Sequence, residues 1–251
     1  MAHRNDILAY CNQLLQPQLF KDYCPNGLQV EGRSEIKKII SGVTASRALI
    51  EAAIAHNADT LLVHHGLFWR GHDGSVTGWL KQRLALLLAH DINLLAYHLP
   101  LDAHAQWGNN AQLAALMGWQ ATDRFGEQAL GMLGHAVQGD LNALTLTHEL
   151  AAKLGTTPVA VVPDPKRVIK RIAWCTGGAQ SWFESAIAAG ADAYVTGEIS
   201  EPQAHLAHET GVAFFACGHH ATERYGAPAL AAHVSEHFGI AHEFIDIHNP
   251  A

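Results

Sequence analysis

Two adjacent histidines, His64 and His65, end a short apolar stretch in the segment T-L-L-V-H-H-G. The apolar stretch is typical of a buried β-strand, and Gly66 gives the chain freedom to turn directly after it. Where the chain leaves the strand, both imidazoles can face the edge of the sheet at which open α/β folds bind ligands. The pair could bind a metal ion there, or it could simply be a polar strand end.

In two further segments, a histidine is followed four residues later by a carboxylate. Y-H-L-P-L-D contains His98 and Asp102, and G-H-H-A-T-E contains His219 and Glu223. Both segments come directly after an apolar strand. A separation of four residues places two side chains on one face of a helix, although Pro100 disfavours a regular helix in the first segment.

The types of these side chains indicate metal chemistry. Glu198, in the motif T-G-E, ends another apolar strand. Imidazole and carboxylate ligands suit Zn, Fe, Mn, Co or Ni, and the lack of cysteine ligands argues against a structural zinc site. Three or more histidines with two carboxylates exceed the needs of one open ion, so we expect two divalent ions per chain, about 3.5–4 Å apart. The alternative is that each residue only caps a strand or is a polar core residue.

The elements that must position these side chains alternate between strand and helix. The hydrophobic periodicity predicts strands at 36–43, 59–65 and 92–98, with helices at 44–56 and 79–90 between them. This order predicts parallel strands joined by right-handed crossovers. Further helices are predicted at 5–15, 109–117, 147–154 and 222–238.

The second half of the chain repeats the first β-α-β pattern. The segment that starts at Ile36 aligns without a gap with the segment that starts at Ile169, and several polar positions are identical. In this register His65 corresponds to Glu198. We interpret the repeat as an internal duplication.

The duplication predicts two α/β halves, residues 1–125 and 126–251. If the halves pack about a pseudo-twofold axis, the four strand ends that carry the histidines and carboxylates can face one cleft. The breakers around V-P-D-P come shortly before the second repeat.

Composition limits the class of protein. Hydrophobic residues make up 49% and charged residues 16% of the 251 residues, as in a globular protein with a large core. The net charge of −7 argues against general nucleic-acid binding. The four cysteines form no C-x-x-C pair and are expected to be reduced. No apolar run is long enough to span a membrane, and the charged N-terminus does not suit a signal peptide, so we expect a cytoplasmic location.

Several long motifs closely resemble those of the Nif-three-like family: C-P-N-G-L-Q-V-E-G, V-H-H-G-L-F-W, Y-H-L-P-L-D-A-H and G-H-H-A-T-E-R. The resemblance covers essentially the whole chain and is strongest to a bacterial branch labelled as type two GTP cyclohydrolase I homologs. It implies two similar, interlinked, three-layer α/β/α domains with mixed sheets. It also implies a toroidal homohexamer with metal sites that face its interior.

Carried over motif by motif, the family's two-metal site implies these ligands: His64, His65, Asp102, His219 and Glu223. His98 and Glu198 lie in family motifs beside the metals. We expect His98 to shuttle protons without ligating, because a sixth protein ligand would close a position that water or substrate needs.

The resulting hypothesis is a dinuclear metal-dependent hydrolase with Fe, Zn or Mn. The ions would activate a water and polarise the substrate, and His98 or Glu198 would move the proton. The family label indicates a nucleotide substrate such as GTP, yet the sequence shows no P-loop, and the small-molecule substrate is not identified. The alternative is a non-catalytic metal-binding ring that binds a partner or handles metal.

Overall fold

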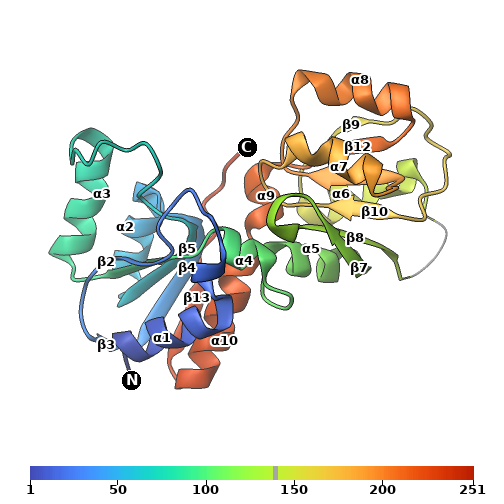
Figure 1. Cartoon of the computed structure of the whole chain (residues 1–251). Helices are drawn as coiled ribbons and strands as arrows, with labels where there is room; N and C mark the ends of the chain where they lie inside the picture. The colour runs from blue at the N-terminus through green and yellow to red at the C-terminus, as the bar shows by residue number, and fades with distance from the viewer. Residues whose placement is uncertain (138–140) are drawn as a thin grey trace. The chain divides into compact units, whose positions relative to one another are not determined.

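The computed structural model describes residues 1–137 and 141–251, and within these the chain forms two compact units (Figure 1). Unit 1 contains Met1–Gly108 and Gly226–His248, and unit 2 contains Asn109–Tyr225 and Asn249–Ala251. The units are interlinked because the chain leaves unit 1 and later returns to it. The prediction from sequence placed one boundary near residue 125. In the structure the strand that ends there pairs within unit 2.

Unit 1 is built on a five-stranded sheet with the order β13-β4-β5-β6-β2. The parallel centre consists of β4 (Lys38–Thr44), β5 (Thr60–His65) and β6 (Asn93–Ala96). At one edge β13 (Ala241–Phe244) pairs in parallel with β4, and at the other β2 (Gly27–Val30) pairs antiparallel with β6. The β-α-β order of the sequence therefore gives the parallel strands that it predicted.

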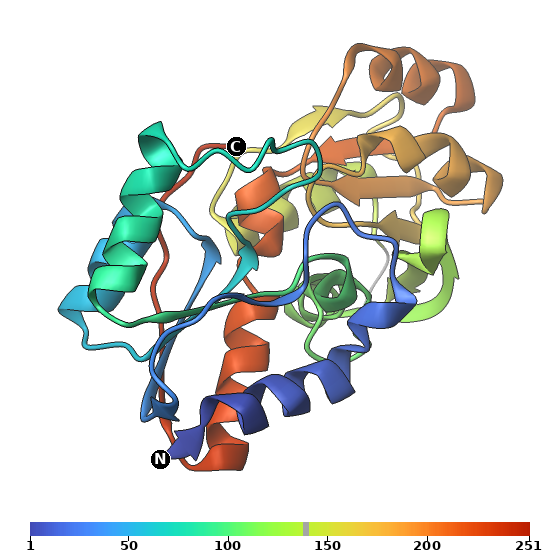
Figure 2. The same ribbon diagram turned by 60° about the vertical axis from the view of Figure 1, so that its left-hand side comes forward.

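Helices cover both faces of this sheet (Figures 1 and 2). On one face lie α2 (Arg47–Ala55) and α3 (Gly78–Ala89), and on the other lie α1 (Arg4–Leu15) and α10 (Gly226–Phe238). Unit 1 thus has three layers. It also contains the short strands β1 (Ala2–His3) and β3 (Glu35–Ile36), which pair with each other, and the 3-10 turn η1 (Pro17–Leu19).

The alternation of strand side chains explains why both faces are covered. Ile40 and Leu61 pack under α2 and α3, whereas Ile39 and Leu62 pack under α1 and α10. Successive side chains of a strand point to opposite faces, so an uninterrupted apolar strand needs an apolar partner on each side.

A short helix, α4 (Leu99–Ala103), follows β6 in unit 1. Pro100 stands in its first turn, where the missing N–H of proline costs no helical hydrogen bond. Asp102 therefore lies on a helix despite the proline.

Unit 2 is built on a six-stranded mixed sheet with the order β7-β8-β10-β11-β12-β9. Its central strands β10, β11 and β12 are parallel, and the flanking strands are antiparallel. The bounds are β7 (Trp119–Phe125), β8 (Gly131–Ala136), β9 (Val159–Val161), β10 (Ile172–Trp174), β11 (Ala193–Thr196) and β12 (Ala213–Ala216).

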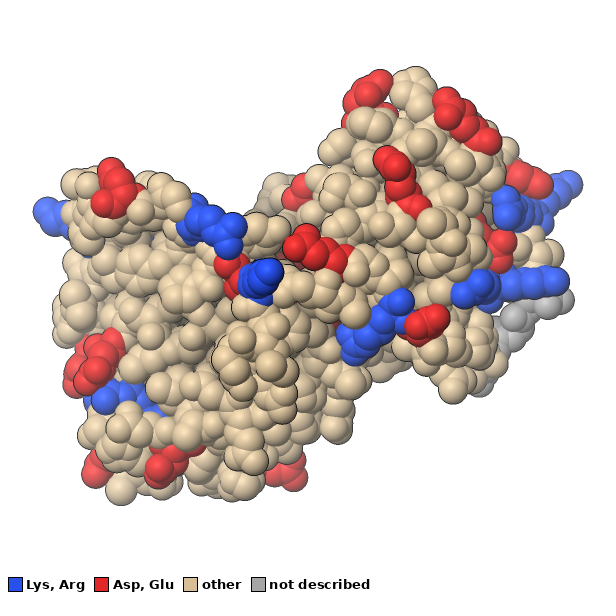
Figure 3. Space-filling view, in the orientation of Figure 1, with Lys and Arg blue, Asp and Glu red and all other residues tan. Residues whose placement is uncertain are grey.

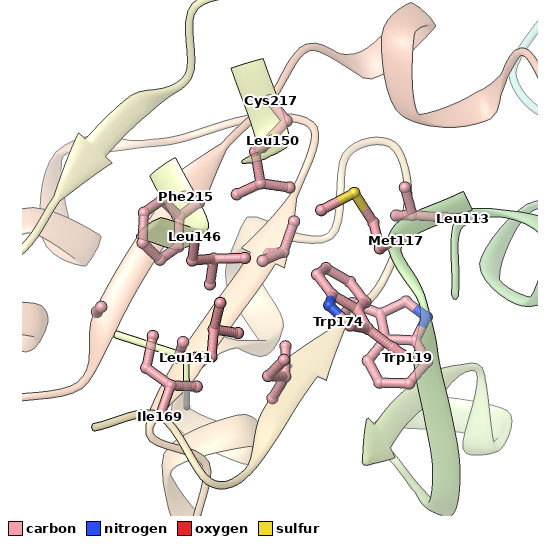
Figure 4. Close-up of a cluster of buried hydrophobic side chains, with 14 of the residues drawn as sticks. Leu113, Met117, Trp119, Leu141, Leu146, Leu150, Ile169, Trp174, Phe215 and Cys217 are labelled. Carbon is pink, nitrogen blue, oxygen red and sulfur yellow. The ribbon is translucent and has the colours of Figure 1, made fainter. Parts of the chain in front are cut away.

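The sheet of unit 2 is also covered on both faces. α5 (Asn109–Met117) and α6 (Ala143–Leu154) cover one face, and α7 (Phe183–Ala188) and α8 (Glu201–Thr210) cover the other. Figure 4 shows the first of these cores, where the rings of Trp119 and Trp174 pack with centroids 5.2 Å apart. The short elements are η2 (Glu127–Ala129), η3 (Gln180–Trp182) and α9 (His219–Glu223).

The helix predicted at 222–238 is two helices. α9 ends at Glu223 and α10 begins at Gly226. The break coincides with the point at which the chain passes from unit 2 to unit 1. Only α10 has apolar positions at helical spacing, and α9 contains a single apolar residue, Ala221. The periodicity therefore indicated a helix here without showing where it begins.

The central strands of the two units have the same order and the same register. Ile39 is paired with Thr60 in unit 1, and at the offset of the repeat Ile172 is paired with Ala193 in unit 2. The structure therefore agrees with the alignment of the two segments. An internal duplication remains our interpretation of that agreement.

The described parts of the chain contain no helix with the length and apolar character needed to cross a bilayer. On the face seen in Figure 3, basic and acidic side chains lie scattered among each other without a broad field of one sign.

Candidate metal-binding site

Unit 1 brings three histidines together where β5 and β6 end. The ring centroids are 4.5 Å apart for His64 and His65, 5.0 Å for His64 and His98, and 5.7 Å for His65 and His98. One ligand atom from each lies within 4.8 Å of the others, so the group could hold a metal ion. We call these three residues the histidine group.

His64 is oriented as a metal-ligating histidine would be. Its Nδ1 donates a hydrogen bond to the carbonyl of Tyr97 at 2.9 Å, because a carbonyl can only accept. This leaves Nε2 as the ligand atom, and Nε2 lies 3.5 Å from Oδ1 of Asp102. Both side chains are buried. A hydrogen bond from the second ring nitrogen to a backbone carbonyl is the usual support of a metal-bound imidazole.

His98 is held by a carboxylate that the sequence did not reveal. Its Nδ1 lies 2.7 Å from Oδ1 of Asp22. The other oxygen of Asp22 accepts from Asn26 Nδ2 at 2.8 Å and from the backbone N–H of Leu99 at 3.0 Å. Burial raises the pKa of Asp22, but His98, Asn26 and a backbone N–H outweigh burial and lower it to about 2. Asp22 is therefore charged and accepts a hydrogen bond from Nδ1–H of His98. In this tautomer Nε2 of His98 can accept a proton.

The motif C-P-N-G-L-Q-V braces this group. Oδ1 of Asn26 accepts from the backbone N–H of His98 at 2.7 Å. Oε1 of Gln29 accepts from the backbone N–H of Leu67 at 2.8 Å, just after the two histidines of β5. No function of this motif could be inferred from the spacing of its residues in the sequence. The structure shows that the motif holds the backbone of His98 and the segment directly after β5.

Cys24 lies next to the same group. One ligand atom from each of Asp22, Cys24 and His98 lies within 4.8 Å of the others. Burial raises the pKa of Cys24 to about 12, and the charges of Asp22 and Asp102 act in the same direction. Cys24 is therefore a thiol at neutral pH. None of the four cysteines forms a disulfide bond, in agreement with the sequence prediction, and all four are buried.

Unit 2 brings together the other predicted site residues. Nδ1 of His219 lies 2.6 Å from Oε1 of Glu198, and its Nε2 lies 3.1 Å from Oε2 of Glu223. Burial lowers the pKa of His219, but hydrogen bonds and charge from Glu223 and Glu198 outweigh burial and raise it to about 9. Two carboxylates around one imidazole form a strongly cation-attracting group, in which a metal ion would compete with the proton.

Glycine makes room for these carboxylates. Gly177 has a φ of +70°, and a Cβ added there would run into the carboxylate of Glu223. The N–H of Gly177 donates to Thr222 Oγ1 at 3.0 Å. At Gly178 an added Cβ would make only ordinary van der Waals contact, 3.5 Å from Glu198 and from His219, so the close approach is specific to Gly177. The segment T-G-G was not singled out from the sequence, although paired glycines after a strand are a recognisable signal of close backbone approach.

The two histidine-to-carboxylate motifs are not equivalent in the fold. His98 is the residue before α4, whereas His219 is the first residue of α9. The strand register leads to the same conclusion. Ala96 and Ala216 occupy the matching ends of β6 and β12, but His98 comes two residues after Ala96 and His219 comes three residues after Ala216. The two motifs are therefore displaced by one residue relative to each other. The carboxylate that contacts His98 is Asp22, while His219 contacts Glu223 as the spacing predicted.

Two interlinked three-layer α/β units, each with imidazole and carboxylate groups where its parallel strands end, define a class of α/β protein with candidate metal-binding sites. The chain belongs to the family described as Duf34/NIF3 (NGG1p interacting factor 3), whose model matches residues 2–250. The resemblance inferred from the motifs is thereby confirmed.

Relatives cover the whole chain. A protein of Neisseria meningitidis serogroup A named "GTP cyclohydrolase 1 type 2 homolog" is 54% identical over 251 residues, which are 100% of both chains. A protein of Escherichia coli K12 with the same name is 46% identical over 96% of both chains.

Solved structures have the same fold. The structure titled "protein ybgI, unknown function" matches with a TM-score of 0.94 and 44% identity over 99% of this chain and 100% of its own. That of TTHA1606 from Thermus thermophilus matches with a TM-score of 0.89 and 32% identity over 99% and 100%. These matches confirm the predicted α/β fold class.

Proposed function

We propose that this chain is a metal-dependent hydrolase. The observation that carries the proposal is the histidine group, in which a backbone carbonyl orients His64 and a carboxylate orients His98. The proposed ligands are those predicted from the sequence: His64, His65 and Asp102 in unit 1, and His219 and Glu223 in unit 2. Two divalent ions per chain, of Fe, Zn or Mn, suit this set of donors.

The residues around the ligands have separate roles in this proposal. Divalent ions, when bound, lower the pKa of water and polarise a carbonyl or phosphoryl oxygen. His98 accepts the proton of the attacking water at Nε2, because Asp22 keeps the proton of the ring on Nδ1. Glu198 positions His219 through its 2.6 Å contact, and it is a second candidate to move a proton.

The substrate proposed is a nucleotide. The names of the relatives, which contain "GTP cyclohydrolase 1 type 2 homolog", support this class. We also propose, from the family resemblance, that copies of the chain assemble into a toroidal homohexamer in the cytoplasm. Light scattering on the purified protein measures the mass of the assembly.

A hydrolase screen of metal-loaded protein tests the proposal. Nucleotides, phosphodiesters and peptides are offered to protein loaded with Fe, Mn or Zn in turn. We expect His98→Gln to retain the metals and lose most of the activity found, at least about 100-fold if His98 acts as general base. Retained metal with no hydrolysis of any substrate by the wild type would instead favour the non-catalytic metal-binding ring. Loss of metal from His98→Gln would make His98 a ligand.

A further inference from the structure

Two exposed aromatic rings of unit 1 lie beside the histidine group. Trp69 is 37% exposed and Tyr23 is 52% exposed, although most large apolar side chains of the unit are buried. The ring of Trp69 lies 5.1 Å from that of His98 and 5.9 Å from that of His65, centroid to centroid. Tyr23 lies 6.5 Å from His98. Exposed aromatic surface next to polar candidate ligands is a common feature of ligand-binding sites.

The segments that carry the two rings are tied together by hydrogen bonds. The backbone N–H of Arg70 donates to the carbonyl of Tyr23 at 2.6 Å, and Nη2 of Arg70 donates to the carbonyl of Asp22 at 3.0 Å. Asp22 in turn holds His98. The segments that carry Trp69 and Tyr23 are therefore tied to each other and to the histidine group. Segments tied in this way lose less conformational entropy when a ligand binds.

Arg70 adds a cation to the same place. Its guanidinium carbon lies 5.3 Å from the centroid of the Tyr23 ring, and the side chain is exposed. A guanidinium stacked on an aromatic ring has donors left at its edge, and their planar fork suits a phosphate or carboxylate.

We propose that Trp69, Tyr23 and Arg70 form a substrate-binding subsite for a planar heteroaromatic ring that carries an anionic group, as in a nucleoside monophosphate. The inference rests on the proposed function, because it places the bound ring beside the histidines that are to hold the metal. The aromatic side chains stack on the heterocycle without selecting one base. Arg70 binds the anionic group.

Binding titrations on the metal-loaded full chain test the subsite, with GMP, guanosine and ribose 5-phosphate as probes. The chain offers a matched control, since Trp79 is 57% exposed and stacks with Arg83 at 4.8 Å on helix α3. We expect Trp69→Ala to weaken GMP binding at least about fivefold, Trp69→Phe to restore most of it, and Trp79→Ala to leave it unchanged.

The cation is tested in the same way. Arg70→Gln should weaken the binding of GMP more than that of guanosine, because only GMP carries the anionic group, whereas loss of the Nη2 bond to Asp22 affects both ligands. Arg83→Gln should change neither. The proposal is overturned if the wild type binds GMP no more tightly than ribose 5-phosphate. It is also overturned if Trp69→Ala and Trp79→Ala behave alike, or if Trp69→Ala alters only the mass of the assembly.

This result is separate from that of the hydrolase screen, because binding is measured without turnover. If the protein shows the expected binding pattern but hydrolyses nothing, the subsite is supported and the proposed hydrolase function is contradicted. If it hydrolyses a substrate without this binding pattern, the hydrolase function is supported and the subsite is contradicted.

Discussion

At the residue scale, the candidate site depends on supports as much as on ligands. His64 and His98 each direct one ring nitrogen to an oxygen acceptor, so each presents the other nitrogen in a fixed direction. The acceptor of His98 is Asp22, which is separated from it by 76 positions in the chain. A spacing pattern within one motif cannot reveal a contact of that length. The histidines could be selected from the sequence because they stand at or just after the ends of apolar strands, and their role as metal ligands stays a prediction.

Asp22→Asn should reduce activity about 10–100-fold while the protein keeps its metal. The amide of asparagine is not a charged acceptor for Nδ1–H of His98. The imidazole ring is therefore no longer held in the tautomer with its proton on Nδ1. Steady-state kinetics and elemental analysis on the same sample measure the two effects. Glu31→Gln, which removes an exposed acid paired with Arg4, is the control and should change neither. Unchanged kinetics in Asp22→Asn would show that this hydrogen bond has no part in the reaction.

Gly177→Ala should destabilise unit 2 and weaken metal binding. The positive φ costs about 1–2 kcal/mol for any residue with a Cβ, and this Cβ would also displace the Glu223 carboxylate. Gly239 separates the two effects, since its φ is +63° and nothing lies within 4 Å of an added Cβ. Thermal unfolding and metal titration of both variants compare them. Equal metal affinity in Gly177→Ala and Gly239→Ala would contradict the crowding account.

At the element scale, the repeated β-α-β segments share a carboxylate brace, which is buried in unit 1 and partly exposed in unit 2. The carboxylate of Asp59 accepts from the backbone N–H groups of Lys37 and Lys38 at 2.7 and 3.0 Å. In unit 2, Asp192 accepts from the corresponding backbone N–H groups, those of Lys170 and Arg171, at 2.9 and 3.0 Å. Each carboxylate thus ties the end of a crossover to the start of the preceding strand.

The pKa of Asp192 predicts a pH dependence of stability. Burial raises this pKa, but the N–H groups of Arg171 and Lys170 and the charge of Arg167 outweigh burial and lower it. A carboxyl group with a lowered folded pKa stabilises the fold above its unfolded pKa of about 4, and this stability is lost as the pH falls through the folded pKa.

Asp192→Asn should therefore cost about 1 kcal/mol at pH 7 and less at pH 3. The measurement is the free energy of unfolding from denaturant titrations at both pH values. A cost that is the same at pH 3 and pH 7 would show that the charge of Asp192 does not contribute. Glu184→Gln, an exposed change on α7, serves as the control.

The elements with a clear hydrophobic period were the ones that sequence could predict. β5, α2 and α5 lie within a few residues of their predicted bounds. The break between α9 and α10 escaped prediction because the apolar positions of α10 indicate a helix without showing where it begins. The one-residue displacement between His98 and His219 could not be predicted for another reason. Only the register of the strands shows which residues of the two units are equivalent.

At the scale of the whole molecule, the sequence predicted two α/β halves but not the path of the chain between them. α10 and β13 return to unit 1, where α10 packs against the same face of the sheet as α1. The hydrophobic periodicity of α10 predicts that the helix packs against an apolar surface. It does not indicate which of the two sheets provides that surface. The contacts that Asp22 and the C-P-N-G-L-Q-V motif make with the histidine group likewise could not be predicted, because they join segments that are far apart in the sequence.

The number of metal ions per chain tests the central proposal most directly. Protein freed of metal and then loaded with Fe, Mn or Zn in turn is analysed for its elements, with the chain concentration from amino-acid analysis. We predict close to two ions per chain for at least one metal, and fewer after His65→Ala or Asp102→Ala. Less than one ion per chain with every metal would contradict the proposed two-metal site.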